Sequence, residues 1–149
     1  MNEKLEIING KKVYDARKAM VVNDGKILLL KTNIPALQLG HNPELGTWDV
    51  PGGRMQINDT DEDTLIREIK EEAGIDAVVV RYLQSFEFYP REDVVIRAKS
   101  FLCRPLSTNV VMNDPEQQHN DFKWVTLDEA LVFDIPKYVR DAILLLKKQ

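Results

Sequence analysis

Cysteine is almost absent from this chain, since Cys103 is the only one among 149 residues. A single thiol can form neither an intrachain disulfide nor a cysteine-ligated metal cluster. We therefore expect Cys103 to be a packed core residue. No apolar run approaches the ~20 residues that a membrane span needs. The segment from Met1 to Glu6 carries charges of both signs and no apolar stretch, so we expect no secretory signal peptide. These absences predict a cytoplasmic protein with no membrane partner.

Positive charge is also scarce. Lys and Arg number 20 against 24 Asp and Glu, which gives a formal net charge of −4 at pH 7. This balance disfavours nucleic acid as a partner, because binding to a phosphate backbone depends on clustered cations. A polyanionic substrate would need metal ions to offset the repulsion. With 44% apolar and 30% charged residues, and with no repeat or linker, the chain is predicted to be one globular domain over residues 1–149.

The N-terminal third predicts a β-hairpin. After a lead-in strand or loop at residues 1–12, Asp24-Gly25 separates strands at 14–23 and 26–30. Residues 31–46 follow as an irregular stretch that contains His41. A loop of that length either folds over a substrate or is a variable surface loop, with His41 solvated. Residues 47–50 predict a short strand.

A helix is predicted to follow and to end at Gly74, a residue that often closes helices in the left-handed conformation. Either Asp59 or Thr60 can cap its N-terminus, with Glu62 or Asp63 completing a capping box. We expect Leu65, Ile66 and Ile69 on the buried face and Asp61 and Lys70 in solvent.

The C-terminal half predicts strands at 77–88 and 94–103, joined by a turn at 89–93. A loop at 104–120 and a strand at 121–125 come next. Thr126 and Glu129 form a capping box for a short helix, and Pro136 can start the last helix. Its core-facing stripe would be Tyr138, Val139, Ala142, Ile143 and Leu146. Helices packed on both faces of a mixed sheet are the expected architecture, an α/β class.

Three carboxylates lie within the central helix at spacings that place them on one face. Glu68, Glu71 and Glu72 stand at i, i+3 and i+4. Such neighbours repel one another by up to a few tenths of a kcal/mol per pair, and a bound cation would relieve that repulsion. Hard oxygen ligands of this kind suit Mg²⁺ or Mn²⁺.

The same residues resemble the signature of the Nudix hydrolases. That signature is written G-x5-E-x7-R-E-U-x-E-E-x-G-U, where U is a bulky aliphatic residue. Its fixed positions are matched by Gly53, Arg67, Glu68, Glu71, Glu72 and Gly74. Six such residues would coincide by chance at on the order of 10⁻⁷ per start position. The upstream run from Gly46 to Gly53 and the segment from Trp124 to Ala130 also look like parts of this family.

The resemblance implies an α/β/α sandwich with a curled mixed β-sheet. It also implies hydrolysis of a pyrophosphate bond in a small nucleotide, a nucleoside diphosphate linked to another group. Glu71 and Glu72 would be metal ligands, Glu68 a ligand or the base that takes a proton from water, and the Gly53 carbonyl a further ligand. Arg67 would orient these carboxylates. Family members are often homodimers.

One position departs from the signature, because Asp59 stands where the family has Glu. Its side chain is one methylene shorter, so its reach differs by about 1.5 Å. Asp59 is either the partner of Arg67 or only the helix N-cap. The departure also raises the alternative of a Nudix module that binds a nucleotide without hydrolysing it, against which the intact Glu68, Glu71 and Glu72 argue.

The substrate group is indicated only by the region after the helix. Pro90 lies sixteen residues beyond Gly74, a position that resembles the ADP-ribose group of the family and favours a substrate of the ADP-ribose or nucleotide-sugar kind. Tyr89 instead resembles the tyrosine of dinucleoside polyphosphate hydrolases. A third alternative is a MutT-like enzyme acting on (deoxy)nucleoside triphosphates.

Aromatic and acidic side chains near Pro90 complete the candidates. Phe86, Phe88 and Tyr89 either stack on a base or belong to the core. Glu87, Glu92 and Glu116 are either additional carboxylates near the metals or ordinary surface charges.

Overall fold

A hairpin organises the first part of the fold. The computed structural model describes residues 2–33, 47–113, 115 and 118–148. Strands β2 (Lys11–Asn23) and β3 (Lys26–Thr32) are joined by Asp24 and Gly25, whose φ angles are 50° and 75°. Two successive positive φ angles are what a two-residue turn needs to match the twist of its strands. The predicted hairpin is confirmed, with β2 starting earlier than expected.

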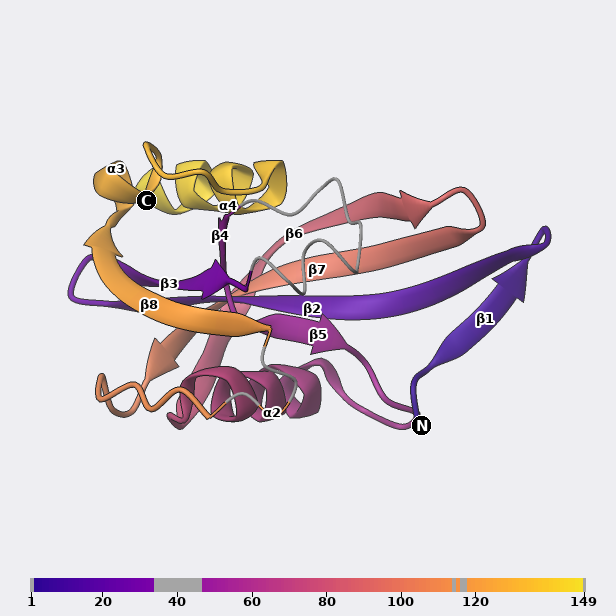
Figure 1. Ribbon diagram of the computed structural model, residues 1–149, viewed down its shortest axis with the longest axis horizontal. Helices are drawn as coiled ribbons and strands as arrows, with labels where there is room; N and C mark the ends of the chain where they lie inside the picture. Colours follow the sequence, from indigo (N-terminus) through magenta and orange to yellow (C-terminus); the bar gives the residue numbers. More distant parts are fainter. Residues whose placement is uncertain (1, 34–46, 114, 116–117, 149) are drawn as a thin grey trace.

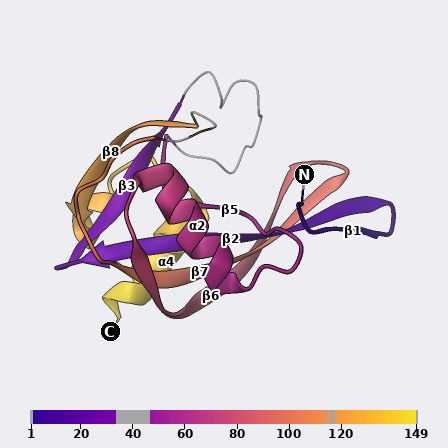
Figure 2. The same ribbon diagram turned by 90° about the horizontal axis from the view of Figure 1, so that it is seen from below.

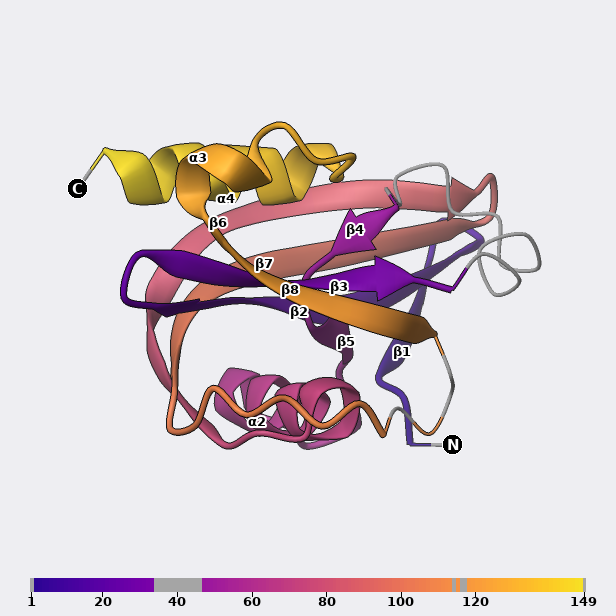
Figure 3. The same cartoon turned by 60° about the vertical axis from the view of Figure 1, so that its left-hand side comes forward.

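The strands form a curled mixed sheet in the order β4-β3-β2-β7-β6 (Figure 3). The long strands β6 (Ala77–Arg91) and β7 (Val94–Pro105) are antiparallel to each other, and β7 runs parallel to β2. Along its other side, β2 pairs in turn with β1 (Leu5–Ile8), β5 (Gly52–Arg54) and β3. Strand β3 also pairs with β4 (Trp48–Asp49) and β8 (His119–Thr126).

Helices cover both faces of this sheet, as Figures 1 and 2 show. Helix α2 (Asp61–Ala73) lies on one face, and α3 (Leu127–Ala130) and α4 (Lys137–Lys147) lie on the other. The expected α/β class and sandwich architecture are confirmed. Within the described ranges, no helix is long and apolar enough to span a membrane.

Helix α2 begins and ends where its local sequence predicts. Thr60 and Asp63 form a reciprocal capping box, and Gly74 takes the left-handed conformation at φ 71°. Leu65 and Ile69 are fully buried, in one apolar cluster with strands β2, β3 and β7. Two expectations were wrong, because Ile66 is only half-buried and Asp61 is partly covered. Asp61 is covered by its ion pair with a buried arginine of β2, described below.

Helix α4 closes the opposite face. Pro136 is its N-cap, and four residues of the predicted stripe, Tyr138, Val139, Ala142 and Ile143, are buried. The fifth, Leu146, is only partly buried against the same cluster. These side chains pack with Met20, Ile27 and Leu29 from the sheet and with Val50, which follows β4. The capping box of Thr126 and Glu129 also forms as expected and opens α3.

Strand lengths account for the remaining corrections. The predicted turn at 89–93 was wrong at its start, because β6 continues through Tyr89, Pro90 and Arg91. Pro90, which has no N–H to donate, falls where the β6–β7 register shifts between Phe88 and Arg91. Strand β8 starts at His119, earlier than predicted. Most of the predicted loop at 31–46, with His41, and also Glu116, lie outside the described residues.

Candidate active site

Two carboxylates of α2 converge on the Gly52-Gly53 turn. A Cβ atom added to Gly53 would lie 2.6 Å from Cδ of Glu68 and closer still to Oε1, so the Glu68 side chain can hold this position only opposite a glycine. One turn further along the helix, Oε1 of Glu72 accepts a hydrogen bond of 3.3 Å from the N–H of Gly52. Glu72 is 5% exposed. The helix and the glycine turn therefore hold two acidic side chains against one short backbone segment.

A histidine joins this group from the far end of the chain. Nδ1 of His119, at the start of β8, lies 3.8 Å from Oε1 of Glu72, and both side chains are nearly buried. His119 falls within the predicted loop at 104–120, and its proximity to Glu72 depends on the pairing of β8 with β3. The alternation of side chains along this strand gave no sign of the contact between His119 and Glu72.

Asp59 is the partner of Arg67, and Thr60 rather than Asp59 caps the helix. The Asp59 carboxylate accepts hydrogen bonds from Nη1 of Arg67 at 2.8 Å, Oγ1 of Thr64 at 2.8 Å and the N–H of Gln56 at 2.9 Å. Burial raises the pKa of Asp59, but the hydrogen bonds from Gln56, Thr64 and Arg67 outweigh it and hold the pKa below its usual value. The shorter acid thus still reaches the arginine beside Glu68.

The third carboxylate, Glu71, is exposed to solvent. Across the part of the chain that the structure describes, no three His, Cys, Asp or Glu side chains already surround a position where a metal ion could sit. The donors at the turn nonetheless fit a hard divalent cation, because they are carboxylates and a backbone carbonyl. The space that Gly53 leaves for the Glu68 carboxylate also fits a divalent cation at this turn.

The predicted substrate residues lie elsewhere on the sheet. Phe86 stacks on Tyr138 of α4 with ring centroids 4.7 Å apart, and Phe88 stacks beside them. Both rings therefore occupy the face opposite α2. Tyr89 is 54% exposed, and its hydroxyl donates a 3.0 Å hydrogen bond to Glu87, which raises the pKa of Tyr89. The structure does not bring Phe88, Tyr89 or Pro90 to the Gly52-Gly53 turn.

A buried polar cluster lies just upstream of the turn, on the α4 face. The Tyr138 hydroxyl donates to Oδ2 of Asp49 at 2.7 Å, and Nζ of Lys18 lies 3.5 Å from Oδ1. The same lysine lies over the Tyr138 ring, 5.5 Å from its centroid. Sequence reasoning missed this cluster. An acid between Trp48 and Val50 in the predicted strand at 47–50 was the available signal.

Comparison with known proteins agrees with the fold. Residues 14–146 match the NUDIX domain, which is most of the chain. The chain therefore belongs to the Nudix hydrolase family, as its signature indicated.

Relatives within this family differ in the substrates that their names state. A CTP pyrophosphohydrolase of Escherichia coli is 32% identical over 51% of this chain, and the match covers 52% of that relative's length. An ADP-ribose pyrophosphatase of Methanocaldococcus jannaschii is 29% identical over 82% of this chain and 68% of its own length. The crystal structure of a MutT protein from Methanosarcina mazei Go1 superposes with a TM-score of 0.73 at 23% identity, covering 95% of this chain and 96% of that one. This last likeness shows the fold alone.

Proposed function

We propose that this chain is a Mg²⁺- or Mn²⁺-dependent hydrolase that cleaves a pyrophosphate bond in a nucleoside diphosphate linked to another group. The observation that carries the proposal is the fit between Gly53 and Glu68, with Glu72 held at the adjacent amide. A solvated acidic helix face would not need a glycine opposite one of its carboxylates.

Each residue of the turn has a role that follows from its position. Glu68, Glu71, Glu72 and the Gly53 carbonyl would hold the metal. When bound, divalent ions neutralise the anionic oxygens of pyrophosphate, orient water and lower its pKa. Glu68, which lies nearest the glycine turn, is a ligand or the group that accepts the proton of the attacking water.

Arg67 acts indirectly, through other side chains of the site. Its guanidinium is engaged by Asp59 at 2.8 Å and lies 3.5 Å from the carbonyl oxygen of Arg54, so it ties the start of the helix to the strand that contains Gly53. We assign it to positioning Glu68 and Glu72.

Two observations favour an ADP-ribose or nucleotide-sugar substrate. Pro90 occupies the position that resembles the ADP-ribose group, and the relative named ADP-ribose pyrophosphatase aligns with most of this chain. The relative named CTP pyrophosphohydrolase supports the alternative, a (deoxy)nucleoside triphosphate. A cytoplasmic location, a homodimer and a single domain over residues 1–149 stay predictions.

A hydrolysis screen with products identified by mass tests the proposal. The panel holds ADP-ribose, nucleotide sugars, diadenosine polyphosphates and (deoxy)nucleoside triphosphates, each with Mg²⁺, with Mn²⁺ and with a chelator. AMP and ribose phosphate from ADP-ribose would support the favoured substrate. Pyrophosphate and a nucleoside monophosphate would move the assignment to the MutT-like alternative. Absence of turnover under every condition would leave a nucleotide-binding module.

A further inference from the structure

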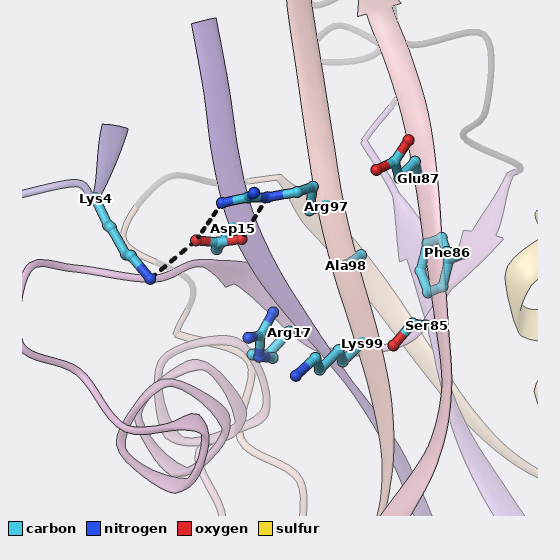
Figure 4. Close-up of a pocket in the computed structure, with 9 residues that line it drawn as sticks. All are labelled: Lys4, Asp15, Arg17, Ser85, Phe86, Glu87, Arg97, Ala98 and Lys99. Atoms are coloured by element: carbon cyan, nitrogen blue, oxygen red, sulfur yellow. Dashed lines mark hydrogen bonds and ion pairs between the residues drawn. The ribbon is translucent and has the colours of Figure 1, made fainter. Parts of the chain in front are cut away.

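An open pocket of about 480 Å³ lies on strands β2, β7 and β6 (Figure 4). It is lined by Lys4, Asp15, Arg17, Ser85, Phe86, Glu87, Arg97, Ala98 and Lys99. The lining contains four cations and two carboxylates, a positive excess in a chain of net charge −4. Apart from Lys4, the side chains that carry these charges come from two rows that cross the strands.

The first row is electrostatically balanced. On neighbouring strands Asp15 pairs in register with Arg97, and Arg97 with Glu87. Nε of Arg97 lies 3.1 Å from Oδ1 of Asp15, and Nζ of Lys4 lies 3.1 Å from Oδ2. Burial raises the pKa of Asp15, but the hydrogen bonds and charges of Lys4 and Arg97 bring it below its usual value. This row needs no external ion.

The second row is not balanced. Arg17, Lys99 and Ser85 are register partners across β2, β7 and β6, two cations and a hydroxyl side by side. Like charges directly opposite each other on a sheet are destabilising. Nε of Arg17 binds Asp61 at 2.6 Å, whereas Lys99 has no ion-pair partner among the described residues. In Figure 4 the Lys99 side chain extends toward Arg17. An anion between them would relieve the repulsion.

The same row continues to the glycine turn. Arg17 is also the register partner of Gly53 across β2 and β5. With neighbouring strands ~4.8 Å apart, Lys99 lies two strand spacings, ~10 Å, from Gly53. One line of adjacent residues therefore runs from the carboxylate site to Lys99 on a single face of the sheet.

We propose that Arg17, Lys99 and Ser85 form a subsite for a phosphate group carried by the substrate about 10 Å from the scissile pyrophosphate. The guanidinium, the ammonium and the hydroxyl are all donors to phosphate oxygens. This inference rests on the proposed function. It narrows the substrate to a nucleoside diphosphate whose linked group bears a further phosphate.

Phosphate binding can be tested without turnover. Amide chemical shifts are followed by NMR while inorganic phosphate is added to the metal-free protein. We expect the amides of Ser85 and Lys99 to shift when phosphate is added, and we expect Lys99→Gln to raise the apparent Kd for phosphate about tenfold. Lys123→Gln, the same change in an exposed lysine of β8, should leave the titration unchanged, and Lys99→Arg should restore it. Unshifted amides at both positions in the wild-type protein would overturn the subsite.

Steady-state kinetics then show whether the phosphate bound in the pocket belongs to the substrate or is free phosphate. ADP-ribose and its derivative phosphorylated on the terminal ribose are compared by their ratio of kcat/KM. The ratio should fall about tenfold in Lys99→Gln, through KM for the phosphorylated substrate, and stay constant in Lys123→Gln. If the kcat/KM ratio is unchanged in Lys99→Gln although the wild-type protein binds phosphate in the NMR titration, the pocket takes free phosphate. That result would overturn the assignment of a substrate with a further phosphate. If the wild-type protein hydrolyses neither compound, the proposed function fails while the titration still judges the pocket.

Discussion

Replacing Gly53 with alanine tests the active-site geometry most directly, because the added methyl group would enter the space of Glu68. The new Cβ would lie 2.6 Å from Cδ and 3.2 Å from Cγ of that side chain. Carbon atoms in contact sit about 3.5–4.0 Å apart, so the carboxyl group must move by about 1 Å. Its new position would no longer match the Gly52-Gly53 backbone.

The expected loss concerns rate far more than stability. A displacement of about 1 Å in a group that positions the reaction costs on the order of 100-fold in rate. The obstructing atoms belong to the far end of a flexible side chain, which can rotate away. We therefore expect kcat of Gly53→Ala to fall about 100-fold, with a melting temperature close to that of the wild-type protein.

The neighbouring glycine provides the matched contrast. A Cβ atom at Gly52 would meet the backbone, with Cα of Lys18 at 3.0 Å and the carbonyl oxygen of Arg17 closer. Backbone atoms of a central strand cannot rotate away, so Gly52→Ala should lower the melting temperature clearly. Thermal unfolding and steady-state kinetics on both variants separate the two effects.

A double-mutant cycle shows whether Gly53→Ala acts through Glu68. If it does, adding Gly53→Ala to Glu68→Gln should cost little beyond Glu68→Gln alone. Fully additive losses, or a Gly53→Ala enzyme with wild-type kcat, would refute the reasoning that this glycine makes room for a functional carboxylate.

Three further outcomes are expected. Glu71→Gln should reduce metal-dependent hydrolysis by at least about 100-fold without changing thermal unfolding. Glu62→Gln, at an exposed site of the same helix, should hydrolyse the substrate at the wild-type rate. Equal rates in the two variants would contradict the metal-site assignment. Asp59→Asn should lower the free energy of unfolding at pH 7 by about 1–3 kcal/mol. Because the folded pKa of Asp59 is lowered, its stabilisation is present above the ordinary value of about 3.9 and is lost as the pH falls through the folded pKa, so urea titrations of the two proteins should converge in acid. Cys103 is fully buried, and burial raises the pKa of its thiol to about 12, so a thiol reagent at pH 8 should label it only on unfolding.

Local signals in the sequence accounted for most of the element types. The Asp24-Gly25 hairpin and the helix closed by Gly74 depend on contacts within a few residues, and both formed as predicted. The end of β6 was missed because Pro90 and its neighbours favour a turn locally, whereas pairing with β7 extends the strand and takes up the proline at an irregularity.

The candidate site was predictable only in part. The spacing of Arg67, Glu68, Glu71 and Glu72 predicted both the family and the helix face that carries the carboxylates. Whether Asp59 caps the helix or binds Arg67 was open, because both roles suit an acid at that position. Packing decided it, since Thr60 took the cap and left Asp59 facing the arginine.

The sequence by itself determined the hairpin, the end of helix α2 at Gly74 and the acidic signature, because each follows from neighbours along the chain. Only the tertiary structure decided that His119 meets Glu72 and that Arg17 and Lys99 stand side by side in line with Gly53. Those contacts depend on strand order and register, which place residues far apart in the chain about one strand spacing from each other.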